Sequence, residues 1–268
     1  MNQTGVIPQS VWKVADRILP GTSIWNFDWD VCCILDGCRV DTFRKFYPRA
    51  GAYFSVGSTS KQWISRTFVG DLSEVALITG NPFTTDLSDS EFAYLHREPV
   101  QDTVYGVETV PPSVLVDRAA QVYKDRDDIE RLVIHFMQPH VPFRSEHQWF
   151  DQFRGTGIWG SSVWTRVVSG DIDRETWFRA YRDNLKWVLD SGVSPLLDMV
   201  DGTVALTADH GNAAGEWGVV GHPKNTVVPS VRLVPWQTLT GVQRTDPSSV
   251  DTVGTYDQDA QLAALGYR

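Results

Sequence analysis

Four short apolar runs limit what this chain can fold into more strongly than any other feature of its sequence. They span residues 31–35, 75–79, 131–136 and 203–207, and each ends in a turn that contains polar residues or glycine. Continuous apolar runs of this length are typical of strands that are buried on both faces in a parallel sheet. The sequence therefore predicts a central, mostly parallel sheet.

Helical periodicity appears between these runs. Apolar residues recur at helical spacing in residues 114–125 and, over a longer stretch, in residues 174–197. Strands that alternate with helices predict an α/β fold in which helices cover both faces of the sheet, a three-layer sandwich. The length of 268 residues is compatible with one large domain, and we expect residues 1–268 to form it.

Polar clusters follow three of the predicted strands directly. Asp36-Gly-Cys-Arg39-Val-Asp41 follows the first run, Met137-Gln-Pro-His140 the third and Ala208-Asp209-His210-Gly211 the fourth. Ligands of open α/β sheets bind outside the carboxyl ends of the strands, so these clusters are expected to meet there. Asp209 and His210 offer adjacent oxygen and nitrogen ligands. The alternatives are a solvated turn for this pair and a helix cap for Asp36 or Asp41.

These motifs, in this order, resemble those of sulfatase-type members of the alkaline phosphatase superfamily. The middle motif extends to Pro142 and Phe143, and the late one is Asp209-His210-Gly211. Residues 216–223, 231–236 and 262–267 resemble small archaeal members in particular. The resemblance implies an alkaline phosphatase-like fold and an enzyme that hydrolyses phosphate or sulfate esters with a bound metal.

The resemblance also implies a set of metal ligands. Asp36, Asp209 and His210 correspond to the positions at which the family holds a divalent cation, and their donor atoms suit Zn²⁺, Mn²⁺, Mg²⁺ or Ca²⁺. His140 and His222 would hold a second metal, bind the anion or protonate the leaving group. Gln138 stands where an acid often occurs, which leaves a second metal one carboxylate short. His135, inside a strand run, is interpreted as structural.

The segment Gly57-Ser-Thr-Ser-Lys-Gln-Trp63 supplies the candidate nucleophile. Its three hydroxyls precede a predicted helix at 61–68, where backbone N–H groups and the helix dipole favour an anion. A simple helix cap is the alternative. The resemblance to archaeal members favours Ser60, with Ser58 next. The Cys-x-Pro-x-Arg signal for formylglycine is absent, which favours phosphate over sulfate esters.

Charge and cysteine content limit the partners. The net charge of −9 argues against nucleic acid, and no apolar run is long enough for a membrane span. Three clustered cysteines and a polar N-terminal stretch favour a reducing cytoplasm. We expect a small-molecule, glycan or lipid ester as substrate and leave the oligomeric state open. A phospho-headgroup transferase and a non-catalytic member of the superfamily remain alternatives.

Overall fold

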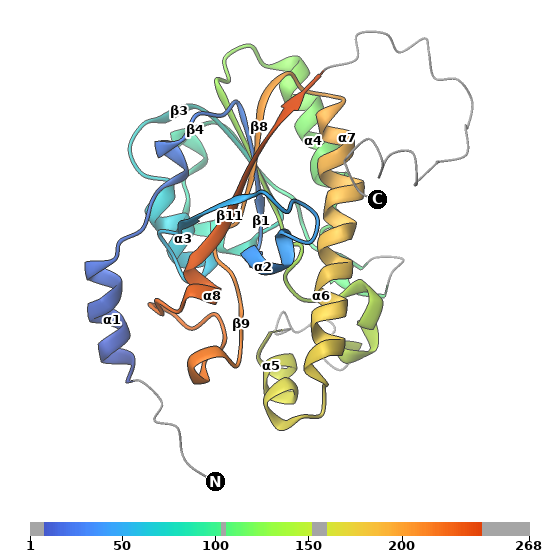
Figure 1. Ribbon diagram of the computed structural model, residues 1–268. Coiled ribbons are helices and arrows are strands. Elements are labelled where there is room, and N and C mark those ends of the chain that lie inside the picture. The colour runs from blue at the N-terminus through green and yellow to red at the C-terminus, as the bar shows by residue number, and fades with distance from the viewer. Residues whose placement is uncertain (1–7, 103–105, 152–159, 243–268) are drawn as a thin grey trace.

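The computed structural model describes residues 8–102, 106–151 and 160–242, and a seven-stranded sheet forms its centre (Figure 1). The strand order is β2-β11-β8-β1-β7-β3-β4. Strands β8, β1, β7, β3 and β4 run parallel, whereas β11 is antiparallel to both of its neighbours. The predicted α/β fold with a mostly parallel sheet is confirmed.

The seven strands are β1 (Val31–Leu35), β2 (Gly51–Phe54), β3 (Leu72–Thr79), β4 (Phe92–Arg97), β7 (Arg131–Phe136), β8 (Gly202–Thr207) and β11 (Leu233–Gly241). Two small hairpins pair β5 (Gln101–Asp102) with β6 (Glu108–Thr109) and β9 (Ala213–Ala214) with β10 (Val220–Gly221). All five residues of β1 are buried, because layers of side chains cover both faces of the sheet. This is why the apolar run at 31–35 is continuous rather than alternating.

Helices cover the two faces of the sheet unequally. Their bounds are α1 (Gln9–Ile18), α2 (Val40–Phe43), α3 (Ser60–Thr67), α4 (Pro112–Asp125), α5 (Gly160–Ser169), α6 (Arg174–Val188), α7 (Ser194–Leu197) and α8 (Pro229–Arg232). One face packs against α4, α6 and α7 through side chains such as Val116, Leu185 and Leu196. The other packs against α3 through Trp63 and Ile64. These layers make the predicted three-layer sandwich.

The long helix expected at 174–197 is interrupted. Helix α6 ends at Val188, a π-helical turn spans Leu189–Val193, and α7 follows. Gly192 lies in that turn, and a Cβ atom there would stand 3.1 Å from the ring of Phe136 at the end of β7. The lack of a side chain at Gly192 thus allows this turn to pack closely on the end of β7.

Two further expectations concern the chain as a whole. No helix in the described ranges combines the length and apolarity that crossing a bilayer requires. The segment 262–267, which carries part of the resemblance to archaeal proteins, lies outside the described residues.

Candidate active site

The carboxyl ends of β1 and β8 bring three predicted metal ligands together. The two strands are parallel neighbours, with Ile34 opposite Thr207, so the residues that follow them leave the sheet side by side. One donor atom each from Asp36, Asp209 and His210 lies within 4.8 Å of the other two. All three side chains are buried.

The ring of His210 is oriented for ligation. Its Nδ1 lies 2.8 Å from the carbonyl oxygen of Gly211. A carbonyl can only accept a hydrogen bond, so Nδ1 carries a proton and Nε2 is the ring nitrogen left to face the cluster. Nε2 faces the carboxylates, 3.4 Å from Asp209 Oδ2 and 3.7 Å from Asp36 Oδ1. A carbonyl partner behind the ring is the usual arrangement of a metal-bound histidine.

Each carboxylate offers one oxygen to the protein and leaves the other without a hydrogen bond. Asp36 Oδ2 accepts from Asn81 Nδ2 at 2.7 Å. Asp209 Oδ1 accepts from the backbone N–H groups of Gly37 at 2.9 Å and His210 at 2.8 Å. Asp36 Oδ1 and Asp209 Oδ2 are buried without any hydrogen-bond partner among the described residues. Buried, unpaired carboxylate oxygens are costly unless a cation meets them, so these residues fit a divalent metal.

The pKa values of the two acids diverge. Burial, followed by repulsion from Asp209, raises the pKa of Asp36 well above its ordinary value. Burial also acts to raise the pKa of Asp209, but attraction to His210 and His135 together with hydrogen bonds from Gly37 and Ser60 outweighs it and lowers that pKa. Without a cation, the site therefore keeps one carboxylate charged and the other protonated. A divalent cation would allow both to ionise.

The three hydroxyls of the predicted nucleophile segment have different environments. Ser60, the first residue of α3, places Oγ 3.3 Å from Asp36 Oδ2 and 3.2 Å from His210 Nε2. Thr59 is the N-cap, and its Oγ1 accepts from the Gln62 N–H at 3.2 Å. Ser58 Oγ instead donates to the carbonyl oxygens of the Gln62 side chain and the Pro223 backbone. The structure brings Ser60, but neither of its neighbours, to the ligand cluster.

His140 and His222 lie beside this cluster. Their Nε2 atoms are 3.0 Å apart, and the rings of His210 and His222 stack with centroids 4.3 Å apart. Burial, followed by repulsion from His210, lowers the pKa of His140 to about 4 and that of His222 well below its ordinary value. Both rings are therefore neutral at neutral pH. Gln138 lies elsewhere, because its side-chain amide donates to Thr109 and Val110.

His135 is the residue of this site that the sequence analysis did not assign to it. It is fully buried, and neither ring nitrogen has a hydrogen-bond partner among the described residues. Its Nε2 lies 3.8 Å from Asp209 Oδ2 and 4.0 Å from Asp36 Oδ2. Burial lowers its pKa to about 4. The sequence did contain a signal for this role, because His135 is the single titratable residue near the end of β7, one position before its last residue. β7 lies beside β1, the strand that leads into Asp36.

Polar contacts hold the loop after β1 in place. Arg39 pairs with Asp41 and, 3.0 Å away, with Glu216. The Arg39 N–H donates to Tyr181 Oη at 2.9 Å, and that hydroxyl in turn donates to the Gly37 carbonyl oxygen. These contacts fix Gly37, whose N–H binds Asp209. The loop is thereby tied to the ligand cluster.

Comparison with solved structures supports the fold. No protein-family profile and no curated protein sequence matches this chain. The C-terminal periplasmic domain of phosphoethanolamine transferase EptC from Campylobacter jejuni matches with a TM-score of 0.50 and 14% identity, over 81% of this chain and 82% of that one. The corresponding domain of EcEptC from Escherichia coli, in complex with Zn, matches with a TM-score of 0.50 and 11% identity, over 90% of this chain and 75% of that one.

At these identities the similarity establishes the fold alone. The two domains have alkaline phosphatase-like folds, so the fold predicted from the motifs is confirmed. Neither is archaeal, and no comparison supports the narrower resemblance to archaeal members.

Proposed function

We propose that this protein is a metal-dependent enzyme acting on phosphate esters, with Ser60 as the nucleophile. The observation that carries the proposal is the position of Ser60 Oγ. It lies 3.3 Å from Asp36 and 3.2 Å from His210, beside the two unpaired carboxylate oxygens. A hydroxyl held among metal ligands at the start of a helix is suited to attack on an anionic ester.

The chain's own residues perform definite parts of this reaction. Asp36, Asp209 and His210 would hold the metal, which lowers the pKa of a hydroxyl and neutralises developing charge when bound. Ser60 Oγ gives its proton to water and attacks phosphorus, while the bond to the leaving oxygen breaks and that oxygen takes a proton from water. The first N–H groups of α3 and the helix dipole stabilise the added negative charge. The resulting phosphoester of Ser60 is then resolved by water or by an acceptor alcohol.

His140 and His222 are suited to binding rather than to proton donation. A general acid must be protonated near the working pH, whereas burial keeps both rings neutral there. Neutral imidazoles can ligate a second metal or donate an N–H to a phosphoryl oxygen. We assign them to the non-bridging oxygens of the substrate or to a second cation.

Replacing the three hydroxyls one at a time tests the nucleophile. We expect Ser60→Ala to lower turnover of an aryl phosphate by at least about three orders of magnitude, the scale of losing a covalent nucleophile. Metal content, measured by atomic absorption, should stay largely intact. Ser58→Ala is the matched control, because it removes a neighbouring hydroxyl that lies away from the ligands. Loss of activity in Ser58→Ala with retention in Ser60→Ala would contradict the assignment.

The same assay with aryl sulfate tests the choice of ester. Serine lacks the aldehyde hydrate through which formylglycine enzymes release sulfate, so we expect phosphate to be preferred. A clear preference for sulfate, with Zn²⁺, Mn²⁺, Mg²⁺ or Ca²⁺ supplied in turn, would overturn this part of the proposal.

Transfer of a phospho-headgroup to a glycan or lipid is a second candidate function. Its support is that two similar solved structures are domains of phosphoethanolamine transferases. Both candidates share the first half of the reaction and differ in whether water or an alcohol attacks the Ser60 ester. Adding an acceptor alcohol to the assay separates them. A hydrolase releases phosphate whether or not the acceptor is present. A transferase forms the new ester with the acceptor and turns over slowly without it.

A further inference from the structure

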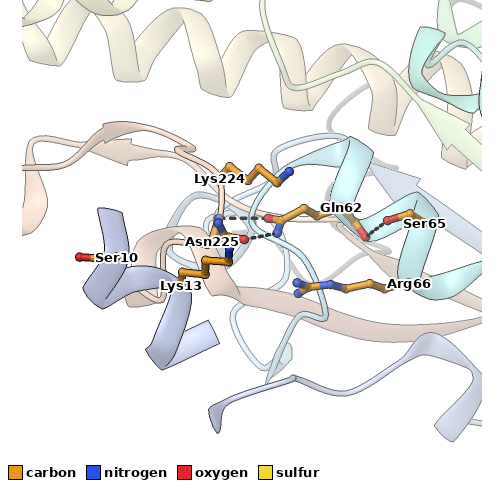
Figure 2. A pocket seen from close by; sticks show the side chains of 7 residues that line it. All are labelled: Ser10, Lys13, Gln62, Ser65, Arg66, Lys224 and Asn225. Carbon is orange, nitrogen blue, oxygen red and sulfur yellow. Dashed lines mark hydrogen bonds between the residues drawn. The ribbon is translucent and has the colours of Figure 1, made fainter. Parts of the chain in front are cut away.

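A basic pocket of about 560 Å³ lies between α1, α3 and the segment that follows β10 (Figure 2). Lys13 projects from α1, Arg66 from α3 and Lys224 from the segment after His222. The amide side chains of Gln62 and Asn225 form the wall between them. A volume of this size accommodates a ligand with more than one functional group.

The charge of this pocket is opposite to that of the chain. No acidic residue is among the described residues that line it, although the net charge of the whole chain is −9. In the described ranges, Lys13 and Lys224 form no ion pair. Three cations against the single carboxylate of Asp16, which pairs with Arg66, raise the local potential and attract an anion.

Arg66 also has capacity for an anion. It shares the buried carboxylate of Asp16 with Arg232, so one negative charge serves two cations. Its NH1 group donates to Asp16 and to the Val56 carbonyl oxygen, and NH2 donates once to Asp16. Of its five N–H donors, Nε–H and one NH2 hydrogen have no partner in the described structure. The group around Asp16 thus keeps a net positive charge at the pocket.

Hydrogen bonds connect this pocket to the segments that carry Ser60 and His222. Gln62 Oε1 accepts from Ser58 Oγ at 2.8 Å and from the Asn225 N–H at 3.1 Å, while Gln62 Nε2 donates to Asn225 Oδ1 at 2.6 Å. Gln62 lies two residues after Ser60 on α3, about 3 Å along the helix axis. Asn225 lies three residues after His222. One wall of the pocket is therefore fixed to both the nucleophile helix and the histidine segment.

We propose that this pocket binds a second phosphate group of the substrate, distinct from the ester that reacts at Ser60. Phosphate suits the lining, because Arg and Lys together bind its oxygens with charge-assisted hydrogen bonds. The inference rests on the proposed function in that the reacting ester occupies the neighbouring site. Binding of phosphate by the pocket itself does not depend on catalysis.

The kinetic test compares an alkanediol bisphosphate with the monophosphate of the same alcohol, using both short and long carbon chains. The variant replaces Lys13 and Lys224 with glutamine and leaves every candidate active-site residue in place. We expect the KM for the bisphosphate of matching length to rise about three- to tenfold, the scale for losing two exposed ion pairs. KM and kcat for the monophosphate should not change. Lys61→Gln is the control, because Lys61 is an exposed cation of α3 that pairs with Asp86 outside the pocket.

A binding measurement separates this inference from the proposed function. Calorimetric titration of the metal-loaded full chain with inorganic phosphate at low salt should detect two sites, one of which disappears in the Lys13→Gln/Lys224→Gln variant. If no phosphoester turns over but the lysine-dependent site persists, the proposed function is wrong and the inference that the pocket binds phosphate is supported. Phosphate binding that is the same in the wild type and in the double variant overturns the inference about the pocket. Equal increases in KM for mono- and bisphosphate, or an equal effect of Lys61→Gln, also overturn it.

Discussion

Replacing Asp36 by asparagine should make the metal-free protein less sensitive to pH while abolishing metal binding. Asp36 is 2% exposed, and its Oδ1 has no hydrogen-bond partner among the described residues. Asparagine keeps its shape and can still accept the hydrogen bond from Asn81 through its carbonyl oxygen. The substitution therefore removes a charge and a titration from the site with little change in packing.

The magnitude follows from the geometry. Two unit charges 4.8 Å apart, the upper limit for the ligand atoms of Asp36 and Asp209, repel by about 3 kcal/mol at an effective dielectric constant of about 20. Burial adds to this cost, and Asp36 responds by keeping its proton, with a pKa well above its ordinary value. In the unfolded chain the same carboxyl group has lost its proton above about pH 4.

The sign of the pH dependence follows from these protonation states. Above the ordinary pKa of Asp36, the folded metal-free protein binds one more proton than the unfolded chain. The free energy of unfolding therefore falls as pH rises, by up to about 1.4 kcal/mol per pH unit, until the raised pKa is passed. The buried histidines, with lowered pKa values, act oppositely, and their effect fades only above about pH 7.5, because each is still half protonated in the unfolded chain at about pH 6.5. Asp36 is therefore isolated from about pH 7.5 upward, by the difference between the wild type and Asp36→Asn, which share these histidines.

Urea unfolding of chelator-treated protein across this pH range measures the effect. We expect the free energy of unfolding of Asp36→Asn to be higher than that of the wild type and its pH slope to be flatter. Adding Zn²⁺ or Mn²⁺ should make the wild type the more stable of the two proteins, because it alone binds the metal, and a ligand at one hundred times its Kd stabilises by about 2.7 kcal/mol. Parallel pH slopes for the two metal-free proteins would refute the reasoning, since Asp36 would then be ionised in the folded state.

Two further predictions concern residues outside the nucleophile and its ligand set. His135→Gln should weaken metal affinity about 10- to 100-fold, because the imidazole faces both carboxylates and has no hydrogen-bond partner among the described residues. Competition with a chromogenic chelator measures this, and unchanged affinity would mean that His135 only fills space. Asp16→Asn should lower the free energy of unfolding by about 3–5 kcal/mol, because it leaves the guanidinium of Arg232, which is 0% exposed, without its carboxylate. Denaturant titration measures this change, and a loss below about 1 kcal/mol would contradict the prediction.

The sequence predicted the centre of the sheet closely and its edges poorly. β1 and β7 have the predicted bounds, because strands covered on both faces have uninterrupted apolar sequences. β2 and β4 lie at the edges of the sheet and are mostly exposed or half-buried, so their sequences lack that signal. β11 mixes exposed, half-buried and buried residues without regular alternation and runs antiparallel beside β8. It also carries Pro235 in its interior, so its sequence lacks the patterns by which a strand is recognised.

The candidate site was predictable where a residue follows a strand directly and not where its position depends on tertiary packing. For Asp36, Asp209 and His210, the rule that parallel strands present their carboxyl ends together predicted that they meet, and the family resemblance implied that they hold a metal. His135 was interpreted as structural because its neighbours in the run are apolar. Only the pairing of β1 with β7 shows that it lies level with Ile34, two residues before Asp36. A polar residue in a buried strand can therefore be assigned to a site only once its neighbouring strand is known.

The choice among the three hydroxyls depends on one close approach of the backbone. At Gly57, a Cβ atom would lie 2.5 Å from the backbone nitrogen of Trp63, so only glycine allows the loop to fold back onto the first turn of α3. Ser58 is thereby brought against Gln62, and Thr59 reaches the Gln62 N–H and caps the helix. With both hydroxyls occupied by the helix start, Ser60 is the first residue whose side chain can turn toward β1 and β8. A helix cap and the proposed nucleophile, alternatives when the sequence is considered alone, are consecutive residues of the same turn.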